Sequence, residues 1–203
     1  MSSGPLFRNK YRISSTRLRG WDYGKDAAYF VTICTKKNFC YFGEIENSRI
    51  KLSEIGKIVY DEWKNTTMIR PYVILDEFVV MPNHIHGIVI INKNDDNDVE
   101  TRCCAQTSQD DTHTVETRCC ASLQRGKQNW IPNKFGSQSH NLASIIRGFK
   151  SAARKRINSK FGQNHFAWQS RFHDRIVRNE LELNKIRWYI RHNPKNWEKD
   201  NYY

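Results

Sequence analysis

The residues best suited to chemistry in this sequence include two histidines that stand two positions apart. His84 and His86 follow a Pro82-Asn83 break and begin an apolar run that ends at Ile91. Residues i and i+2 of a strand point to the same face, so both imidazoles can converge on one divalent cation. The simpler alternative is a pair of hydrogen-bonded polar side chains on a solvated sheet face.

A tyrosine and an asparagine near the end of a predicted helix form the second pattern. Tyr189 and Asn193 stand at i and i+4, so they lie on one face of that helix end. A phenol, whose pKa is about 10, is a weak nucleophile at neutral pH. Beside a metal-bound phosphate it can attack, because the cation stabilises the charge that builds on the phosphoryl oxygens. The alternatives are a half-buried aromatic residue and a polar residue that precedes Pro194.

The rest of the chain predicts the elements that position these residues. Periodicity and β-former content indicate strands over 29–34, 72–81, 84–91 and 172–177, and helices over 52–63, 141–157 and 181–192. The order is therefore strand, helix, two strands, helix, strand, helix. This order predicts an α+β fold of the ferredoxin-like kind, an antiparallel sheet with the helices packed on one face.

Composition and charge narrow the class of partner. The chain has 203 residues, of which 38% are hydrophobic, and 33 basic against 21 acidic residues give a net charge of +12. This size and content suit one domain, and the charge favours nucleic acid over an anionic membrane surface as the partner. No apolar window is long enough to span a membrane, and residues 1–20 lack the apolar stretch of a secretory signal. We therefore expect no membrane partner and a reducing cytoplasm.

One polar segment interrupts the body of the chain. Residues 92–126 are polar and acidic overall, and the segment 99–105 recurs letter for letter at 115–121. This composition predicts a disordered insertion over about 92–139. The alternative is a metal-binding, redox or zinc regulatory module that uses the cysteine pairs 103–104 and 119–120, but these pairs lack the CxxC spacing of a zinc site. Cys34 and Cys40 lie in and just after an apolar run and are expected to be reduced thiols of the core.

The C-terminal third of the chain is strongly basic. From residue 140 to residue 203 there are fourteen Lys and Arg against five Asp and Glu. Such surfaces bind nucleic-acid phosphates, and a tryptophan can stack on a base. The alternative is that many of these side chains belong to solvated helix faces. The candidates for DNA contact are Arg147, Lys150, Arg154, Arg171, Arg175 and Arg178, with Trp168 as a stacking platform and Arg17 and Arg19 in a basic N-terminal arm over residues 1–28.

Five sequence blocks resemble those of one enzyme family in their order and spacing. They cover residues 29–35 (YFVTICT), 79–87 (VVMPNHIHG), 145–151 (IIRGFKS), 168–178 (WQSRFHDRIVR) and 186–194 (IRWYIRHNP). Together they resemble the single-tyrosine HUH transposases, and within them the REP-associated tyrosine transposases. The resemblance runs from about residue 20 to residue 200, apart from the insertion.

The resemblance implies an HUH endonuclease fold over residues 29–203 and a role for each candidate. His84 and His86 are implied to be metal ligands, Asn193 to complete the site, and Tyr189 to be the nucleophile, with Mg²⁺ or Mn²⁺ as the cofactor. The implied partner is single-stranded DNA with palindromic, hairpin-forming elements. A monomer or homodimer would cleave and rejoin this DNA through a 5′-phosphotyrosine, in the bacterial cytoplasm at the nucleoid.

Two points stay open within this resemblance. The base that deprotonates Tyr189 is unassigned, with Asp76, Glu77 and a metal-bound water as the alternatives. The function also has alternatives, namely a domesticated protein that binds DNA hairpins without mobility, or an HUH replication initiator or relaxase. One departure from the family is Phe172-His173, where relatives often have tyrosines.

Overall fold

The computed structural model describes residues 17–18, 20–93, 139–163 and 165–199. Arg19, the two cysteine pairs and nearly all of the predicted insertion lie outside the described residues. The Cys34 thiol is buried, as expected for a core cysteine, whereas the Cys40 thiol is exposed, so the expectation of a core position is wrong for Cys40. Across the described ranges, no helix is both long enough and apolar enough to cross a membrane.

The elements follow the predicted order, with a hairpin and short 3₁₀ turns added. Ser53 caps the first α-helix by accepting from the Gly56 N–H, and Asn141 and Ser144 form a capping box at the second. In chain order the elements are β1 (Ala27–Cys34), η2 (Lys36–Asn38), β2 (Gly43–Glu46), β3 (Arg49–Leu52), α1 (Glu54–Ile69), β4 (Val73–Val80), β5 (His84–Ile91), α2 (Leu142–Phe161), β6 (His173–Ile176), α3 (Glu180–His192) and η3 (Asn193–Lys199).

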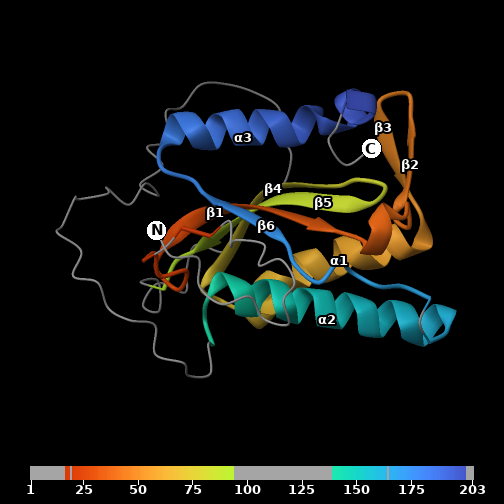
Figure 1. The fold of residues 1–203 in the computed structure, drawn as a ribbon, viewed down its shortest axis with the longest axis horizontal. Coiled ribbons are helices and arrows are strands. Elements are labelled where there is room, and N and C mark those ends of the chain that lie inside the picture. Colours follow the sequence, from red (N-terminus) through yellow and green to blue (C-terminus); the bar gives the residue numbers. More distant parts are fainter. Residues whose placement is uncertain (1–16, 19, 94–138, 164, 200–203) are drawn as a thin grey trace, which may run out of the picture.

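Four strands form one antiparallel sheet in the order β4-β5-β1-β6. The central strands β5 and β1 are in a register that places His84 opposite Cys34 and His86 opposite Thr32. With α1 between β1 and β4 and α2 between β5 and β6, this is the order of a ferredoxin-like fold (Figure 1). The predicted fold class, α+β with an antiparallel sheet, is therefore confirmed.

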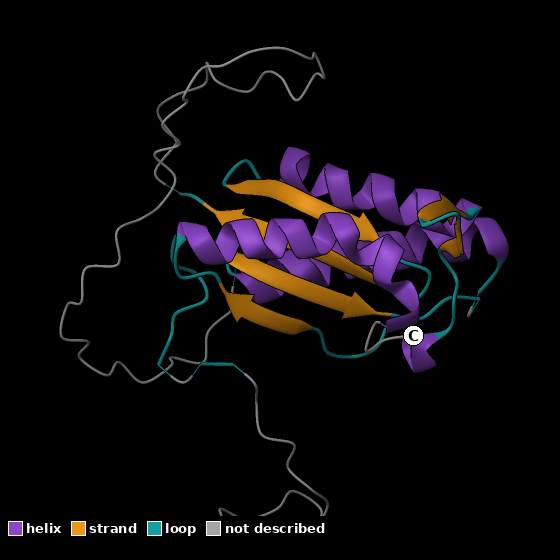
Figure 2. Cartoon of the chain, turned by 90° about the horizontal axis from the view of Figure 1, so that it is seen from above, coloured by secondary structure: helices purple, strands orange, loops and turns teal. Residues whose placement is uncertain are grey.

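The helices cover both faces of this sheet, α1 and α2 on one face and α3 on the other (Figure 1, Figure 2). The expectation that the helices pack on one face is therefore correct for α1 and α2, whereas α3 packs on the opposite face. The reason lies in the alternation along β5. Ile85 and Val89 belong to the core under α1 and α2, whereas Ile88 packs with Leu183 and Ile190 of α3. Because both faces of this central strand are apolar, both require a cover of helices.

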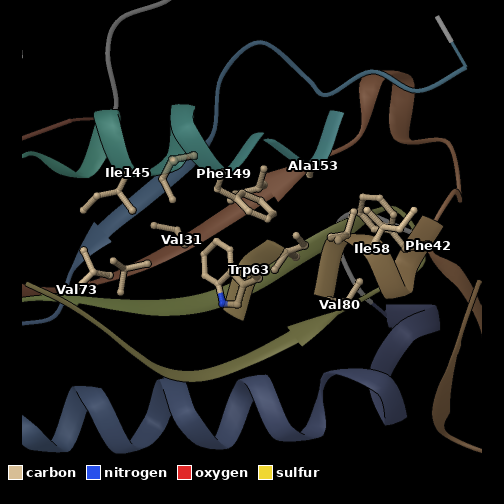
Figure 3. Packing of buried hydrophobic residues seen from close by; sticks show 14 of the residues in the cluster. Val31, Phe42, Ile58, Trp63, Val73, Val80, Ile145, Phe149 and Ala153 are labelled. Atoms are coloured by element: carbon tan, nitrogen blue, oxygen red, sulfur yellow. The ribbon is translucent and has the colours of Figure 1, made fainter. Parts of the chain in front are cut away.

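The larger core lies between the sheet and the helices α1 and α2 (Figure 3). Trp63 of α1 is buried there, edge-on to Phe149 of α2 with ring centroids 4.9 Å apart. Gly87 of β5 makes room for the indole, because a Cβ at this position would lie 2.7 Å from Trp63 Cζ2. Packing on this face holds β5 in place and leaves its other face to the histidines.

The β2–β3 hairpin and the 3₁₀ turns η2 and η3 were not predicted from the sequence. The hairpin turns at Asn47 and Ser48, which have φ values of 49° and 61°, as two-residue hairpin turns require. The alternating polar and apolar residues 44–46 were the available signal for it. η3 follows α3 directly and packs against β3, so the hairpin and η3 meet beyond the end of α3 (Figure 1).

Candidate active site and nucleic-acid groove

His84 and His86 lie on the face of β5 that α3 covers, and 0% and 1% of their surfaces are exposed. Their ring centroids are 4.4 Å apart, so the two-residue spacing brings the imidazoles together as expected. The alternative of a solvated sheet face is wrong, because rings from α3 and η3 lie over this pair. Two buried imidazoles side by side require hydrogen-bond or metal partners for their ring nitrogens.

Each imidazole is oriented by a contact at its Nδ1 atom. Asn83 Oδ1 lies 2.7 Å from His84 Nδ1, while Asn83 Nδ2 donates to the Asn38 carbonyl at 3.2 Å. An amide oxygen only accepts, so the proton of His84 is on Nδ1 and its lone pair is on Nε2. Thr32 Oγ1 lies 2.9 Å from His86 Nδ1, which leaves Nε2 of that ring to face α3.

Tyr189 reaches the same point from α3. Its hydroxyl lies 3.2 Å from His86 Nε2, and 40% of the residue is exposed. Phe30 of β1 stacks on His86 at 5.4 Å and meets Tyr189 edge-on at 6.1 Å. The hydroxyl therefore points at the histidine pair while part of the residue stays open to solvent, as a macromolecular substrate requires.

Asn193 and Trp197 close this end of the site. Asn193 is the C-cap of α3 and the first residue of η3, and only 2% of it is exposed. Trp197 lies over His84, with ring centroids 5.9 Å and planes 29° apart. Sequence reasoning missed Trp197, because a short 3₁₀ turn has no apolar period to reveal it. It also missed Asn83, whose place next to His84 was the signal, and Thr32, which strand pairing alone brings to the site.

The side chains present fit a divalent cation. Two histidines with oriented Nδ1 atoms are typical of metal ligands that bind through Nε2, and Asn193 adds a buried neutral oxygen donor. Nitrogen ligands suit Mn²⁺ well, while Mg²⁺ prefers oxygen and water. Within the described ranges, no three or more His, Cys, Asp or Glu side chains lie together in a way that could hold a metal ion. A cation held here would therefore leave several coordination positions to water and substrate.

The two carboxylates considered as bases for Tyr189 each form an ion pair with an arginine of α3. Asp76 Oδ2 accepts from Arg187 Nε at 2.9 Å, and Glu77 Oε1 accepts from Arg191 Nε at 2.9 Å. The hydrogen bond to Asp76 raises the pKa of Arg187, and the one to Glu77 raises the pKa of Arg191. These ion pairs favour a structural role for both carboxylates over a role as the base.

A groove of about 1210 Å³ lies between α2 and the segment 163–174. Its lining contains six Lys and Arg side chains but a single carboxylate, that of Asp174. This carboxylate pairs with Arg17 at 3.2 Å. The lining includes Thr32, whose hydroxyl contacts His86, although neither histidine nor Tyr189 is itself part of the lining. A basic groove of this kind suits a nucleic-acid backbone. Six of the nine DNA candidates line it, namely Arg17, Arg147, Lys150, Arg154, Trp168 and Arg171.

These side chains differ in how far they are available to a ligand. Lys150 is half-buried and donates to the Gln169 carbonyl, and its burial lowers its pKa. Trp168 donates Nε1 to the Lys150 carbonyl at 3.0 Å and packs against Phe149 and Phe166. The indole therefore belongs to the packing beneath the groove, which does not support the expected stacking platform.

Arg175 and Arg178, two further DNA candidates, are not part of the groove lining. Arg175 pairs with Glu182 at 2.6 Å, which links β6 to α3. Arg178 is exposed in the loop between these two elements. Arg19 lies outside the described residues. The ion pair of Arg175 gives it a structural role in addition to any contact with DNA.

Comparison of the sequence with known proteins shows a family for this chain. No protein-family model matches the chain. An uncharacterized protein of Haemophilus influenzae is 34% identical over 191 residues, which cover 93% of this chain and 92% of the relative. This chain belongs to the family of that protein. The near-complete coverage on both sides means that the shared family extends over the whole described fold.

The fold also has a counterpart among solved structures. The chain is similar to the structure of a REP-associated tyrosine transposase bound to a REP hairpin, with a TM-score of 0.53 and 15% sequence identity. The match covers 91% of this chain and 74% of the transposase chain. At that identity the likeness shows the fold alone. The chain has the fold of a REP-associated tyrosine transposase, as the sequence blocks predicted.

Proposed function

We propose that this chain is a transposase-like enzyme that cleaves and rejoins single-stranded DNA through Tyr189, with Mg²⁺ or Mn²⁺ as its cofactor. The observation that carries the proposal is the Tyr189 hydroxyl, 3.2 Å from Nε2 of the buried His86, with the ring of His84 beside it. A nucleophile next to paired metal ligands is what metal-assisted phosphoryl transfer requires. The transposase fold supports the same conclusion.

The chemistry divides between the cation and the side chains. His84, His86 and Asn193 would hold the cation, which when bound stabilises negative charge on the phosphoryl oxygens. Tyr189 Oη loses its proton and forms a bond to phosphorus as the bond to the 3′-oxygen breaks, and the 3′-oxygen takes up a proton. The product is a 5′-phosphotyrosine ester. The phosphotyrosine linkage is itself a phosphodiester, so the energy of the broken DNA bond is retained. A second 3′-hydroxyl can therefore displace Tyr189 and rejoin DNA without ATP.

The groove is the proposed place for the rest of the DNA. The solved transposase of the same fold is bound to a REP hairpin, and we propose that this chain also binds DNA that forms a hairpin. The exposed Arg147 and Arg154 and the half-buried Lys150 line one wall of the groove, where they would contact phosphates. A strand that leaves the hairpin past Thr32 would lie next to His86, which the Thr32 hydroxyl contacts.

The test is a covalent adduct with single-stranded DNA that carries the palindromes flanking the gene. With Mn²⁺, the wild-type protein should form an adduct that survives SDS, and Tyr189→Phe should form none while its affinity for DNA stays within about twofold. Tyr60→Phe is the matched control, because Tyr60 lies on α1 beside Phe78, on the far side of the sheet from α3. An adduct that persists in Tyr189→Phe would assign the nucleophile to another residue. A wild-type protein that binds the DNA without forming an adduct would favour the domesticated hairpin-binding alternative.

A further inference from the structure

Two arginines of α3 stand two residues before and two residues after Tyr189, and each pairs with a carboxylate of β4. Arg187 binds Asp76 Oδ2 through Nε at 2.9 Å and through Nη2 at 2.7 Å. Arg191 Nε binds Glu77 Oε1 at 2.9 Å. Since Arg187 and Arg191 are i and i+4, they lie on one flank of the helix. The proposed nucleophile therefore lies between two anchors on a single stretch of α3.

A β-bulge makes this double pairing possible. Between Leu75 and Phe78 the register of β4 against β5 shifts. In a regular strand, consecutive residues point to opposite faces of the sheet. The bulge breaks that alternation, and the consecutive residues Asp76 and Glu77 both bind α3. In a regular strand, only one of these carboxylates would point toward α3, and the other would point to the opposite face of the sheet.

Asp76 joins the bulge to α3 through its two oxygens. Its Oδ1 accepts from the Glu77 N–H at 2.8 Å, while its Oδ2 binds Arg187. This pair is also the better shielded, since 17% of the Asp76 side chain and 28% of that of Arg187 are exposed, against 29% and 60% for Glu77 and Arg191. Shielded ion pairs are screened less by water and salt. The Asp76–Arg187 pair is therefore the stronger of the two anchors.

Apolar packing sets the rotation of α3 only coarsely. Leu183 and Ile190 are buried with Ile88 of β5 and so fix which side of the helix meets the sheet, but the hydrophobic effect adds no directional contact. Ion pairs on one flank of the helix do restrict both its rotation and its position along its axis. This restriction matters for the direction of Tyr189, because a displacement of about 1 Å at a reacting group can lower a rate about 100-fold.

We propose that Asp76, Glu77, Arg187 and Arg191 form a clamp, the α3 clamp, that positions the Tyr189 hydroxyl at the histidine pair. The inference rests on the proposed function of Tyr189 as the nucleophile. The four residues are positioning residues, because they act through the helix and the bulge. Their loss should lower the rate of the chemical step and leave DNA binding in the groove unchanged, since none of them lines the groove.

The experiment measures single-turnover adduct formation, DNA affinity and the melting temperature for clamp variants. Arg187→Ala and Asp76→Asn should each lower the adduct rate about 10- to 100-fold, with the dissociation constant for DNA within about twofold. The matched control is the Arg156–Glu62 pair, which joins α2 to α1 at 3.0 Å on the other face of the sheet. Glu62→Gln should leave the adduct rate unchanged whatever it does to the melting temperature.

A charge exchange separates positioning from general stability. Asp76→Arg combined with Arg187→Asp restores a pair of opposite charges across the bulge, and it should recover about tenfold of the rate that either single change loses. If Arg187→Ala does not fold, Asp76→Asn and the exchanged pair decide the question, since both keep polar partners at these positions. A wild-type adduct rate in the clamp variants, together with a Tyr189-dependent adduct, overturns the clamp and leaves the proposed function standing. The absence of any Tyr189-dependent adduct from the wild-type protein overturns both.

Discussion

The Tyr189 hydroxyl and Nε2 of His86 lie 3.2 Å apart, although 103 positions separate the two residues in the sequence. That nitrogen is also one of the two that would ligate a cation, because Thr32 occupies Nδ1 of the same ring. The hydroxyl and a cation bound at this site would therefore compete for one lone pair. The affinity for metal would then measure the strength of the contact between Tyr189 and His86.

Removal of the Tyr189 hydroxyl should raise the affinity for Mn²⁺. A hydrogen bond contributes about 1 kcal/mol net, so the protein without it should bind the ion about fivefold more tightly. Isothermal titration calorimetry of DNA-free Tyr189→Phe and wild-type protein measures the difference. His86→Ala, which removes the ligand, is the control that should abolish binding. Weaker binding by Tyr189→Phe would show that the hydroxyl is itself a ligand.

The three residues proposed to hold the cation should differ in how much cleavage depends on them. His84→Ala and His86→Ala should each abolish adduct formation, because the loss of one imidazole leaves the cation poorly held. Asn193→Ala should have a smaller effect, about 10- to 100-fold, because water can replace a neutral oxygen donor. The adduct assay at rising Mn²⁺ concentration should rescue Asn193→Ala most readily. Full activity of His86→Ala would exclude the proposed site.

DNA affinity should depend on pH through Lys150. Burial lowers the pKa of this lysine, and its protonated form would bind a phosphate. The contribution is therefore complete below the lowered pKa and is lost as the pH rises through it, at a lower pH than for an exposed lysine. Lys150→Arg should remove this loss because arginine stays charged. Fluorescence anisotropy from neutral to alkaline pH measures it, with Lys160→Arg, an exposed lysine of the same helix outside the groove lining, as the control that keeps the wild-type profile.

Replacement of residues 94–138 by a short Gly-Ser linker should preserve the fold. Lys93 donates to the Gly24 carbonyl, and Leu142 N–H donates to the adjacent Tyr23 carbonyl at 3.0 Å, so the flanks of this segment are already close. Closure entropy changes by only about 0.6 kcal/mol per doubling of loop length. The melting temperature and the adduct rate measure the outcome, and because the segment is acidic overall, its removal should tighten non-specific DNA binding at low salt. Unfolding of this variant, or of one with all four cysteines of the segment changed to serine, would show that the cysteine pairs are structural.

Features that depend on short-range periodicity were predictable from the sequence. The order of the main strands and helices follows from the apolar period of each segment, and the shared face of His84 and His86 follows from the geometry of any strand. Boundaries were less accurate: α1 extends to Ile69 and α2 to Phe161, beyond the last residues that keep a clear apolar period. Local spacing carries no information on how far a helix continues once tertiary contacts support it.

Features that join distant parts of the chain were decided only by the tertiary structure. The position of α3 on the second face of the sheet depends on apolar residues of β1 and β5 that strand pairing brings together. That position brings Tyr189 to His86, and the bulge at Asp76 aligns two carboxylates with two arginines of the same helix. Each of these contacts joins side chains from elements whose local sequences carry no signal of the partner. Packing and charge complementarity between elements decide such contacts, and the period of a single segment contains neither.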